Sequence, residues 1–207
     1  SYILSRLPMI ALKRSLFPLG EKTKAEVREL AKNAAIPSFE KSESQDICFI
    51  ADGDYRGFLT RCAGDRIQPG SFVDSTGNVV GRHDGLPFYT IGQRKGIRLN
   101  SPTPKYVLRK NVNDGTILVG ERGEASVSMI RLTDVNRLKS VESGEFVWIQ
   151  TRYRSTPCLG MVENETDGSV TLQFNEPQRQ IAPGQVCVLY GNSSEVILSG
   201  TINLINL

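Results

Sequence analysis

The sequence predicts an α+β protein in which a helical region precedes a β-rich region that ends in a small antiparallel barrel. Helical periodicity is confined to the first third of the chain, and from Pro69 onward short apolar runs alternate with turn sequences. The 207 residues contain 39% hydrophobic and 23% charged residues, which is typical of a folded globular chain and excludes extensive disorder. No apolar run approaches the roughly 18 residues that a membrane span needs, so the sequence excludes a membrane protein.

The first 60 residues carry two helical patterns. In the first, Thr23 and Glu26 form a capping box, in which each side chain binds the other residue's free backbone N–H. Apolar residues then recur on one face, which we expect to pack against a core: Val27, Leu30, Ala31 and Ala34. Pro37 should end this helix, because the residue before a proline is pushed out of the α region. The second helix is predicted between Asp54 and Gly64.

Turn sequences separate predicted strands in the rest of the chain. Ser75–Asn78 separates two apolar runs, and Asn113–Gly115 separates two more. The second is the stronger hairpin signal, because a tight turn needs residues that accept positive φ. Further strands are predicted at residues 146–153, 158–162, 170–174, 186–190 and 196–198. Such short strands favour a small closed barrel, which leaves no edge exposed. The changes of pattern predict three domains: residues 1–60, a small β-rich domain at 61–124 and the barrel at 125–207.

Cysteine usage and charge limit the classes of function. The four cysteines lie far apart with no Cys-x-x-Cys pair, and His83 is the single histidine, so the sequence predicts no metal site. No feature marks export, and we therefore expect reduced thiols in a cytoplasmic protein. Residues 61–124 hold ten Lys and Arg against six Asp and Glu, a modest excess that favours a polyanionic partner.

Cys48 is the first candidate for chemistry. It lies in the run Asp46–Ile50, which we interpret as a strand or extended segment, and its apolar neighbours are those of a buried small side chain. A reactive thiol needs a nearby cation or helix N-terminus to lower its pKa. Glu43 and Asp46 are acidic, so activation would have to come through space. Both interpretations stay open. Packing is the favoured interpretation for the other three cysteines, Cys62, Cys158 and Cys187.

Two basic segments are candidates for RNA contact. Residues 82–98 combine four Lys or Arg with two aromatic residues, a composition that can neutralise phosphates and stack on bases, and the alternative is a solvated loop. A catalytic role for His83 has little support, because no Ser or Cys lies near it in sequence. Thr151–Arg154 places Arg-Tyr-Arg at the end of a predicted strand, where charge and stacking could hold RNA. Alternating Arg and Tyr are also common on half-exposed strands.

No nucleotide-binding motif can be placed on the chain. The sequence contains no P-loop, no Gly-x-Gly-x-x-Gly turn after a strand and no Ser-Gly-Gly-x-Asp-Ser loop. A methyltransferase lacks support for a similar reason, since no glycine-rich loop for S-adenosylmethionine can be placed. These negatives keep open a non-catalytic RNA-binding module in which Cys48 is simply buried.

In their order along the chain, the motifs resemble the tRNA-specific 2-thiouridylase family over essentially the whole sequence. The residues that carry the resemblance are Phe17–Gly20, Thr23–Lys24, Ser44–Ile50, His83–Gly85, Tyr89–Gly96, Thr151–Arg154 and Pro183–Gln185. The resemblance implies an enzyme that uses ATP to adenylate the C2 oxygen of the wobble uridine (position 34) of tRNA and then replaces that oxygen with sulfur. It assigns the persulfide that supplies the sulfur to Cys48. The family's tRNA-contacting positions that match are Arg152, Tyr153 and Gln185.

The resemblance also implies parts that these residues do not supply. The family's ATP-binding loop, and a second catalytic cysteine that can form a disulfide with the persulfide cysteine, have no counterpart in the sequence. We therefore expect the C-terminal part of such an enzyme, with residues 1–60 as the remnant of an α/β catalytic domain, and a separate persulfide-bearing protein as sulfur donor. Alone, the chain should bind tRNA weakly and salt-sensitively without hydrolysing ATP, and Cys48 should lie on a loosely ordered segment.

Overall fold

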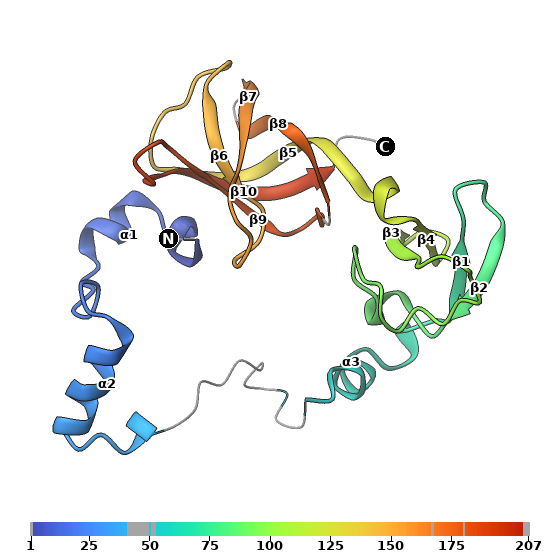
Figure 1. Cartoon of the computed structure of the whole chain (residues 1–207), viewed down its shortest axis with the longest axis horizontal. Coiled ribbons are helices and arrows are strands. Elements are labelled where there is room, and N and C mark those ends of the chain that lie inside the picture. Colours follow the sequence, from blue (N-terminus) through green and yellow to red (C-terminus); the bar gives the residue numbers. More distant parts are fainter. Residues whose placement is uncertain (1, 41–49, 51–52, 167, 180, 205–207) are drawn as a thin grey trace. The chain divides into compact units, whose positions relative to one another are not determined.

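A computed structural model describes residues 2–40, 50, 53–166, 168–179 and 181–204. Contacts within the chain define two units, one formed by residues 1–9 and 65–207 and the other by residues 10–64. The described part combines a few short helices, a mixed sheet and a closed antiparallel barrel, so the predicted α+β class is confirmed (Figure 1). The division into three domains stays a prediction. The predicted strand or extended segment around Cys48 and its loose ordering fall outside the described residues, except at Ile50.

Short helices make up most of the regular structure before residue 65. They are α1 (Met9–Arg14), α2 (Lys24–Asn33) and α3 (Tyr55–Ala63), with 3-10 turns at Ile3–Arg6, Pro37–Glu40 and Gly64–Arg66. The capping box of α2 is confirmed: the Glu26 carboxylate accepts from the Thr23 backbone N–H at 2.6 Å, and the Thr23 hydroxyl accepts from the Glu26 N–H at 3.4 Å. The second helix is also confirmed, with Asp54 at its start and Gly64, at φ 48°, at its end. None of the described helices is long and apolar enough to cross a membrane.

Helix α2 ends before the proline that was expected to end it. Ala35 adopts the left-handed conformation at φ 53°, and the Ile36 N–H bonds back to the Ala31 carbonyl at 2.9 Å. This arrangement satisfies carbonyls in the last turn and turns the chain away from the helix axis. The prediction that Pro37 ends the helix was therefore wrong, because the chain had already left the helical conformation.

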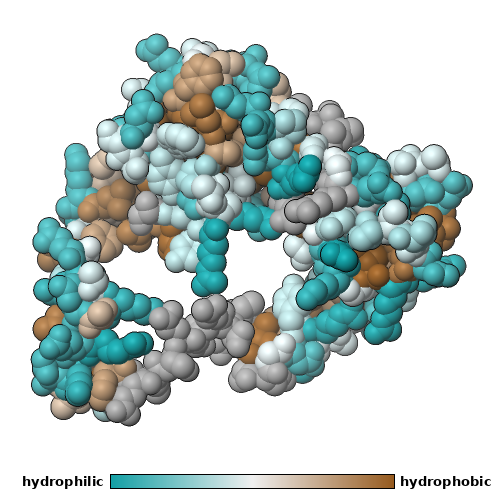
Figure 2. All heavy atoms as spheres, in the orientation of Figure 1, coloured by the Kyte–Doolittle hydropathy of each residue, from teal (hydrophilic) through white to brown (hydrophobic). Residues whose placement is uncertain are grey.

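The apolar faces of the helices are not covered by the described residues. No residue of α2 or α3 is buried, and Leu30, at the centre of the predicted α2 stripe, is 47% exposed. Among the described residues 10–64, only Ile50 is buried. Figure 2 shows apolar side chains among hydrophilic ones on the surface of α1 and α2. Within residues 10–64, no described residue covers the α2 stripe, so this unit does not contain the core that the stripe was expected to pack against.

Four strands form a small mixed sheet. They are β1 (Gly70–Val73), β2 (Val79–His83), β3 (Tyr106–Asn111) and β4 (Thr116–Gly120), in the order β2-β1-β4-β3. Both predicted hairpins are confirmed, and their turns contain Gly77 and Gly115 at φ 86° and 70°. The two hairpins join through a parallel β1–β4 pair, which the turn signals did not predict. The core of the mixed sheet consists of Phe72, Tyr89, Val107, Ile117 and Val119.

Six strands close into an antiparallel barrel (Figure 1). They are β5 (Ser126–Arg137), β6 (Phe146–Gln150), β7 (Cys158–Thr166), β8 (Ser169–Arg179), β9 (Val186–Tyr190) and β10 (Val196–Leu204), in the order β10-β5-β8-β7-β6-β9. Inward-facing side chains from every strand form one core, in which Ile130, Leu132, Val162, Leu172 and Leu189 are fully buried. Each fully buried aliphatic side chain contributes about 1.5–3 kcal/mol, so the core makes the barrel a stable scaffold.

Several strand limits differ from prediction. Strand β5 was not predicted. Strands β7, β8 and β10 extend past their predicted ends, whereas β6 stops at Gln150. Residues 151–153 are therefore not strand, and Arg152 and Tyr153 lie in the turn that follows β6. Side chains in this turn project beyond the end of the barrel, whereas side chains in a strand would lie on its wall.

Candidate RNA interface at one end of the barrel

A braced turn after β6 presents Arg152 and Tyr153. The Ser155 hydroxyl and backbone N–H both donate to the Arg152 carbonyl, at 2.9 and 3.1 Å, and close the turn. The Gln150 side-chain amide donates to the carbonyls of Tyr153 and Ser155 at 3.1 and 2.9 Å. The backbone is thus held from inside while the Tyr153 ring stays 57% exposed. An exposed aromatic ring on a fixed backbone is suited to stacking on an unpaired base.

Gln185 lies at the same end of the barrel. Strands β6 and β9 are antiparallel with Gln150 opposite Val188, so the chain leaving β6 and the chain entering β9 meet there. The Gln185 carbonyl accepts from the Ile202 N–H of β10 at 2.8 Å, which fixes its backbone. Its side-chain carbonyl oxygen is buried and accepts no hydrogen bond from the described residues. Buried acceptors usually have a partner, so this amide has capacity for one.

Gln150 and Tyr190, which were not predicted as site residues, support this end of the barrel. The Tyr190 hydroxyl donates to the Gln150 side-chain carbonyl at 2.7 Å, which orients the amide that holds the turn. Burial, with a smaller contribution from nearby Cys187, raises the pKa of Tyr190 and keeps this donor protonated. A signal for Gln150 existed in the sequence: it is the polar residue that ends an apolar run directly before Thr151–Arg154.

The described thiols are not nucleophiles of this site. Burial is the main cause that raises the pKa of Cys158 and of Cys187, and so disfavours the thiolate in both. Both agree with the packing interpretation, whereas Cys62 is exposed, so that interpretation was wrong for it. These three cysteines are free thiols, and Cys48 lies outside the described residues. The described residues also contain no cluster of three His, Cys, Asp or Glu that could hold a metal ion.

Residues 82–98 fold with their two aromatic side chains against the core of the mixed sheet, Tyr89 buried in it and Phe88 half-buried beside it. Tyr89 is only 4% exposed and packs edge-on against Phe72, with ring centroids 5.2 Å apart, and His83 packs on both rings. The buried His83 ring lies 3.0 Å from the Gly115 carbonyl, and burial is the main cause that lowers its pKa, so His83 is a core residue. Tyr89 therefore cannot stack on bases as the composition suggested. The basic side chains of this segment are exposed: Arg82, Arg94, Lys95 and Arg98.

Gln93 holds the loop that displays two of these cations. Its side-chain carbonyl accepts from the Thr90 N–H at 2.9 Å, and its amide donates to the Lys95 carbonyl at 2.8 Å. Backbone bonds between the loop and Val107 add to this support, at 2.8 and 3.0 Å. Residues 90–96 thus form an ordered basic loop that can approach phosphate groups.

Three protein-family models match successive parts of the chain. They are the tRNA methyl transferase HUP domain at residues 1–52, the tRNA methyl transferase PRC-barrel domain at 56–121 and the aminomethyltransferase beta-barrel domain at 127–202.

Similar curated proteins carry the name tRNA-specific 2-thiouridylase MnmA. The one from Carboxydothermus hydrogenoformans is 42% identical over 204 residues, which cover 98% of this chain and 56% of the relative. Those from Heliobacterium modesticaldum and Magnetococcus marinus are 40% and 38% identical, over 98% and 95% of this chain and 53% and 55% of their own lengths. The chain therefore spans about half the length of these relatives.

Proposed function

Because the chain belongs to the tRNA-specific 2-thiouridylase family, we propose that the gene product carrying it replaces the C2 oxygen of the wobble uridine of tRNA with sulfur. The likeness to relatives over nearly the whole chain supports this activity. The structural observation that supports it best is the braced end of the barrel, where Arg152 and Tyr153 lie at the same end as Gln185.

In the proposed reaction, Cys48 supplies the sulfur. The oxygen of a carbonyl is a poor leaving group, and adenylation converts it into a good one, which departs as part of AMP. A soft sulfur nucleophile on a persulfide of Cys48 can then attack C2 and displace AMP. The family's second catalytic cysteine would form a disulfide with Cys48 as the sulfur passes to the uridine. The sequence has no phosphate-binding loop, so no residue of this chain is assigned to ATP, and the proposed chemistry of the chain starts from the activated uridine.

The three residues at the end of the barrel divide the recognition of tRNA. Arg152 binds a phosphate, Tyr153 stacks on an unpaired base and Gln185 hydrogen-bonds a base edge or a 2′-hydroxyl. Stacking of one base on an aromatic side chain contributes about 1–3 kcal/mol as judged by alanine substitution. The exposed cations of residues 82–98 add long-range attraction for the polyanion. A separate protein, acting in the cytoplasm, delivers the persulfide sulfur to Cys48.

Cys48→Ser in the complete gene product tests the sulfur-carrier role. We expect 2-thiouridine in tRNA to fall to background, while the affinity for tRNA changes by less than about twofold, since a serine is close in size and no phosphate contact is lost. Cys62→Ser, at an exposed free thiol, is the matched control and should thiolate normally. Thiolation retained in Cys48→Ser would disprove the assignment.

A non-catalytic RNA-binding module is the second candidate function. The absence of a nucleotide-binding motif from the sequence favours it, because such a module needs no activated uridine. Alkylation discriminates between the two functions. A catalytic Cys48 should react with iodoacetamide in the complete gene product at least as fast as the exposed Cys62, whereas an inert Cys48 together with absent thiolation would favour the binding module.

A further inference from the structure

We propose that Tyr2 is a positioning residue for the RNA-binding turn, so that the N-terminal segment Tyr2–Leu7 supports the RNA interface at the end of the barrel from behind. The inference rests on the proposed tRNA binding by Arg152 and Tyr153, and it adds a residue from the opposite end of the sequence. Its ligand is a single-stranded RNA segment with an unpaired base.

Tyr2 contacts both sides of the barrel end. Its hydroxyl donates to the Val186 carbonyl, next to Gln185, and its ring lies 6.0 Å from the Tyr153 ring at an angle of 53°. Burial raises the pKa of Tyr2, nearby Cys187 and Tyr190 raise it further, and Arg152 opposes them. The positive charge of Arg152 therefore lies close enough to interact electrostatically with the Tyr2 hydroxyl. One side chain therefore bridges the start of β9 and the turn after β6.

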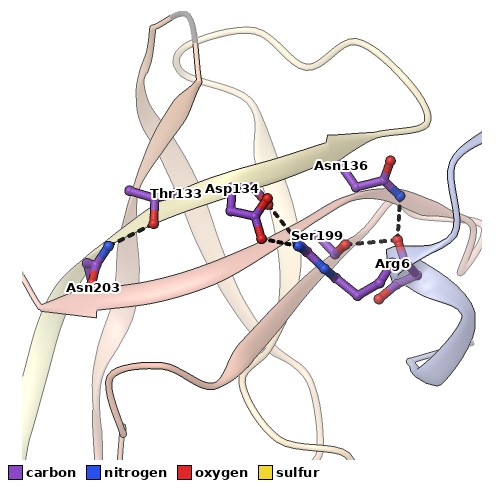
Figure 3. A network of polar contacts seen from close by, with 7 residues as sticks. Arg6, Thr133, Asp134, Asn136, Ser199 and Asn203 are labelled. Atoms are coloured by element: carbon purple, nitrogen blue, oxygen red, sulfur yellow. Dashed lines mark hydrogen bonds and ion pairs between the residues drawn. The ribbon is translucent and has the colours of Figure 1, made fainter.

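The backbone after Tyr2 is bound to the outside of the barrel through side chains of β5 and β10 (Figure 3). The buried Ser199 hydroxyl donates to the Ser5 carbonyl at 2.8 Å. The Asn136 amide donates to the same carbonyl at 2.7 Å and to the Leu7 carbonyl at 2.9 Å. Ser5 is itself buried, so loss of both donors would leave a buried carbonyl without these partners.

An ion pair closes this network. Arg6 pairs with the carboxylate of Asp134 and also donates to its backbone carbonyl. Asp134 adopts φ 49°, a left-handed conformation that is uncommon for residues other than glycine, and this bend in β5 lies at the Arg6 contact. The pair is partly exposed and contributes little alone. The shared buried carbonyl of Ser5 is the stronger part of the network.

The network explains how Tyr2 can affect RNA binding without touching RNA. Its hydroxyl is already bound to Val186, and its ring supports Tyr153 from the side. A ring that is held in place before binding loses less conformational freedom when a base stacks on it, which raises affinity. Tyr2 makes no phosphate contact in this scheme, so it should not alter the salt dependence of binding, whereas Arg152 should.

Binding of the 207-residue chain to a fluorescent tRNA anticodon stem-loop tests the proposal. We expect Tyr2→Ala to weaken binding about threefold to tenfold with an unchanged slope of log Kd against log salt. Tyr2→Phe keeps the ring and should restore affinity to within about twofold of wild type, since stacking support needs the ring rather than the hydroxyl. The double variant Asn136→Ala/Ser199→Ala should reproduce Tyr2→Ala.

Asn203→Ala is the matched control for the network. The Asn203 amide donates to the Thr133 hydroxyl at 2.8 Å between the same two strands but does not bind the N-terminal segment (Figure 3). The affinity of Asn203→Ala for the tRNA stem-loop should equal that of wild type. Urea unfolding of each variant, followed by fluorescence of the single tryptophan Trp148, shows whether the barrel is intact. If Tyr2→Ala fails to fold, the Asn136→Ala/Ser199→Ala variant decides the outcome.

Arg152→Ala separates failure of this inference from failure of the proposed function. Wild-type affinity in both Tyr2→Ala and the double variant, with weakened binding in Arg152→Ala, would overturn the role of Tyr2 and leave the barrel end as the RNA site. Wild-type affinity in Arg152→Ala would instead overturn the proposed RNA contacts. A changed salt slope in Tyr2→Ala would contradict positioning, because it would indicate a lost phosphate contact.

Discussion

The barrel and the helical unit of residues 10–64 treat their apolar side chains in opposite ways. Both carry amphipathic patterns, yet the barrel buries a core of fifteen side chains, whereas Ile50 is the only buried residue among the described part of the helical unit. The barrel closes on itself, so every inward face meets another strand of the same chain. Within residues 10–64, helices α2 and α3 have no such partner among the described residues.

An amphipathic pattern alone therefore does not determine what covers an apolar face. The apolar residues of the stripe through Leu30 recur as regularly as the inward residues of β8. Only the tertiary arrangement decides that the β8 residues are buried and the α2 residues are not. Stability should therefore be concentrated in the barrel, and so should the residues proposed to bind RNA.

Leu172→Ala against Leu30→Ala should give the largest contrast. Leu172 is fully buried in β8, and its truncation should lower the free energy of unfolding by about 2–5 kcal/mol through lost burial and a cavity. Leu30 is exposed, and its truncation should cost less than about 0.5–1 kcal/mol. Urea denaturation followed by Trp148 fluorescence and circular dichroism measures both. Equal losses would show that α2 is as tightly packed as the barrel.

Arg152→Ala against Lys139→Ala tests whether RNA binding is concentrated at one end of the barrel. Arg152→Ala should weaken tRNA binding about tenfold, or ~1.4 kcal/mol, and reduce the salt slope by about one. Lys139 follows β5 at the other end, where it pairs with Glu195 at 3.3 Å on the surface. Its removal takes away the same charge and should change affinity by less than about twofold. Equal effects would indicate nonspecific attraction by net charge.

Cys187 should make the barrel sensitive to alkaline pH, unlike the exposed Cys62 of α3. Burial raises the pKa of Cys187, so the folded state keeps a proton that the unfolded state releases. Stability is then complete below about pH 8.5, the ordinary thiol pKa, and falls by up to about 1.4 kcal/mol per pH unit above it. Denaturation measured between about pH 8 and 9.5 should show this slope. This pH range lies below the ordinary pKa of tyrosine, so tyrosine side chains stay protonated in the unfolded chain. Cys187→Ala should reduce the slope to the part that the raised pKa of Cys158 contributes, and Cys62→Ala should leave the slope unchanged.

His83 should produce the smallest effect, in the mixed sheet. Burial is the main cause that lowers its pKa, so the folded state favours the neutral ring, and stability should fall as the pH drops below about 6.5. The loss should be less than about 1 kcal/mol near pH 6, since the hydrogen bond to Gly115 and the charge of Asp84 oppose the shift. As the single histidine, it gives one imidazole NMR signal to titrate. A titration midpoint at or above 6.5 would contradict this expectation.

Sequence reasoning succeeded where the information is local. The Thr23 capping box, the glycine turns of both hairpins and the limits of α3 follow from a few neighbouring residues. It failed where pairing partners are distant. Strand β5 was missed and the β1–β4 pair was not foreseen as parallel, because neither depends on a turn that joins the two strands.

The candidate RNA site shows the same division. Arg152, Tyr153 and Gln185 were identified from motifs, but Gln150 and Tyr2 were not, because their roles depend on hydrogen bonds and ring contacts across the barrel end. Tyr89 was assigned the wrong environment, since composition gives no direction to a ring. The structure placed that ring in the core of the mixed sheet.

By itself the sequence determined the division into a helical and a β-rich region, the family to which the chain belongs and the residue types that can bind a polyanion. Those properties follow from spacing and side-chain chemistry. Only the tertiary structure decided which amphipathic faces are buried, which thiols are protected and which residue from the start of the chain supports the turn after β6. Binding of the N-terminal segment to the barrel brings Tyr2 and Tyr153 together across most of the sequence, and no local pattern specifies a contact at that separation.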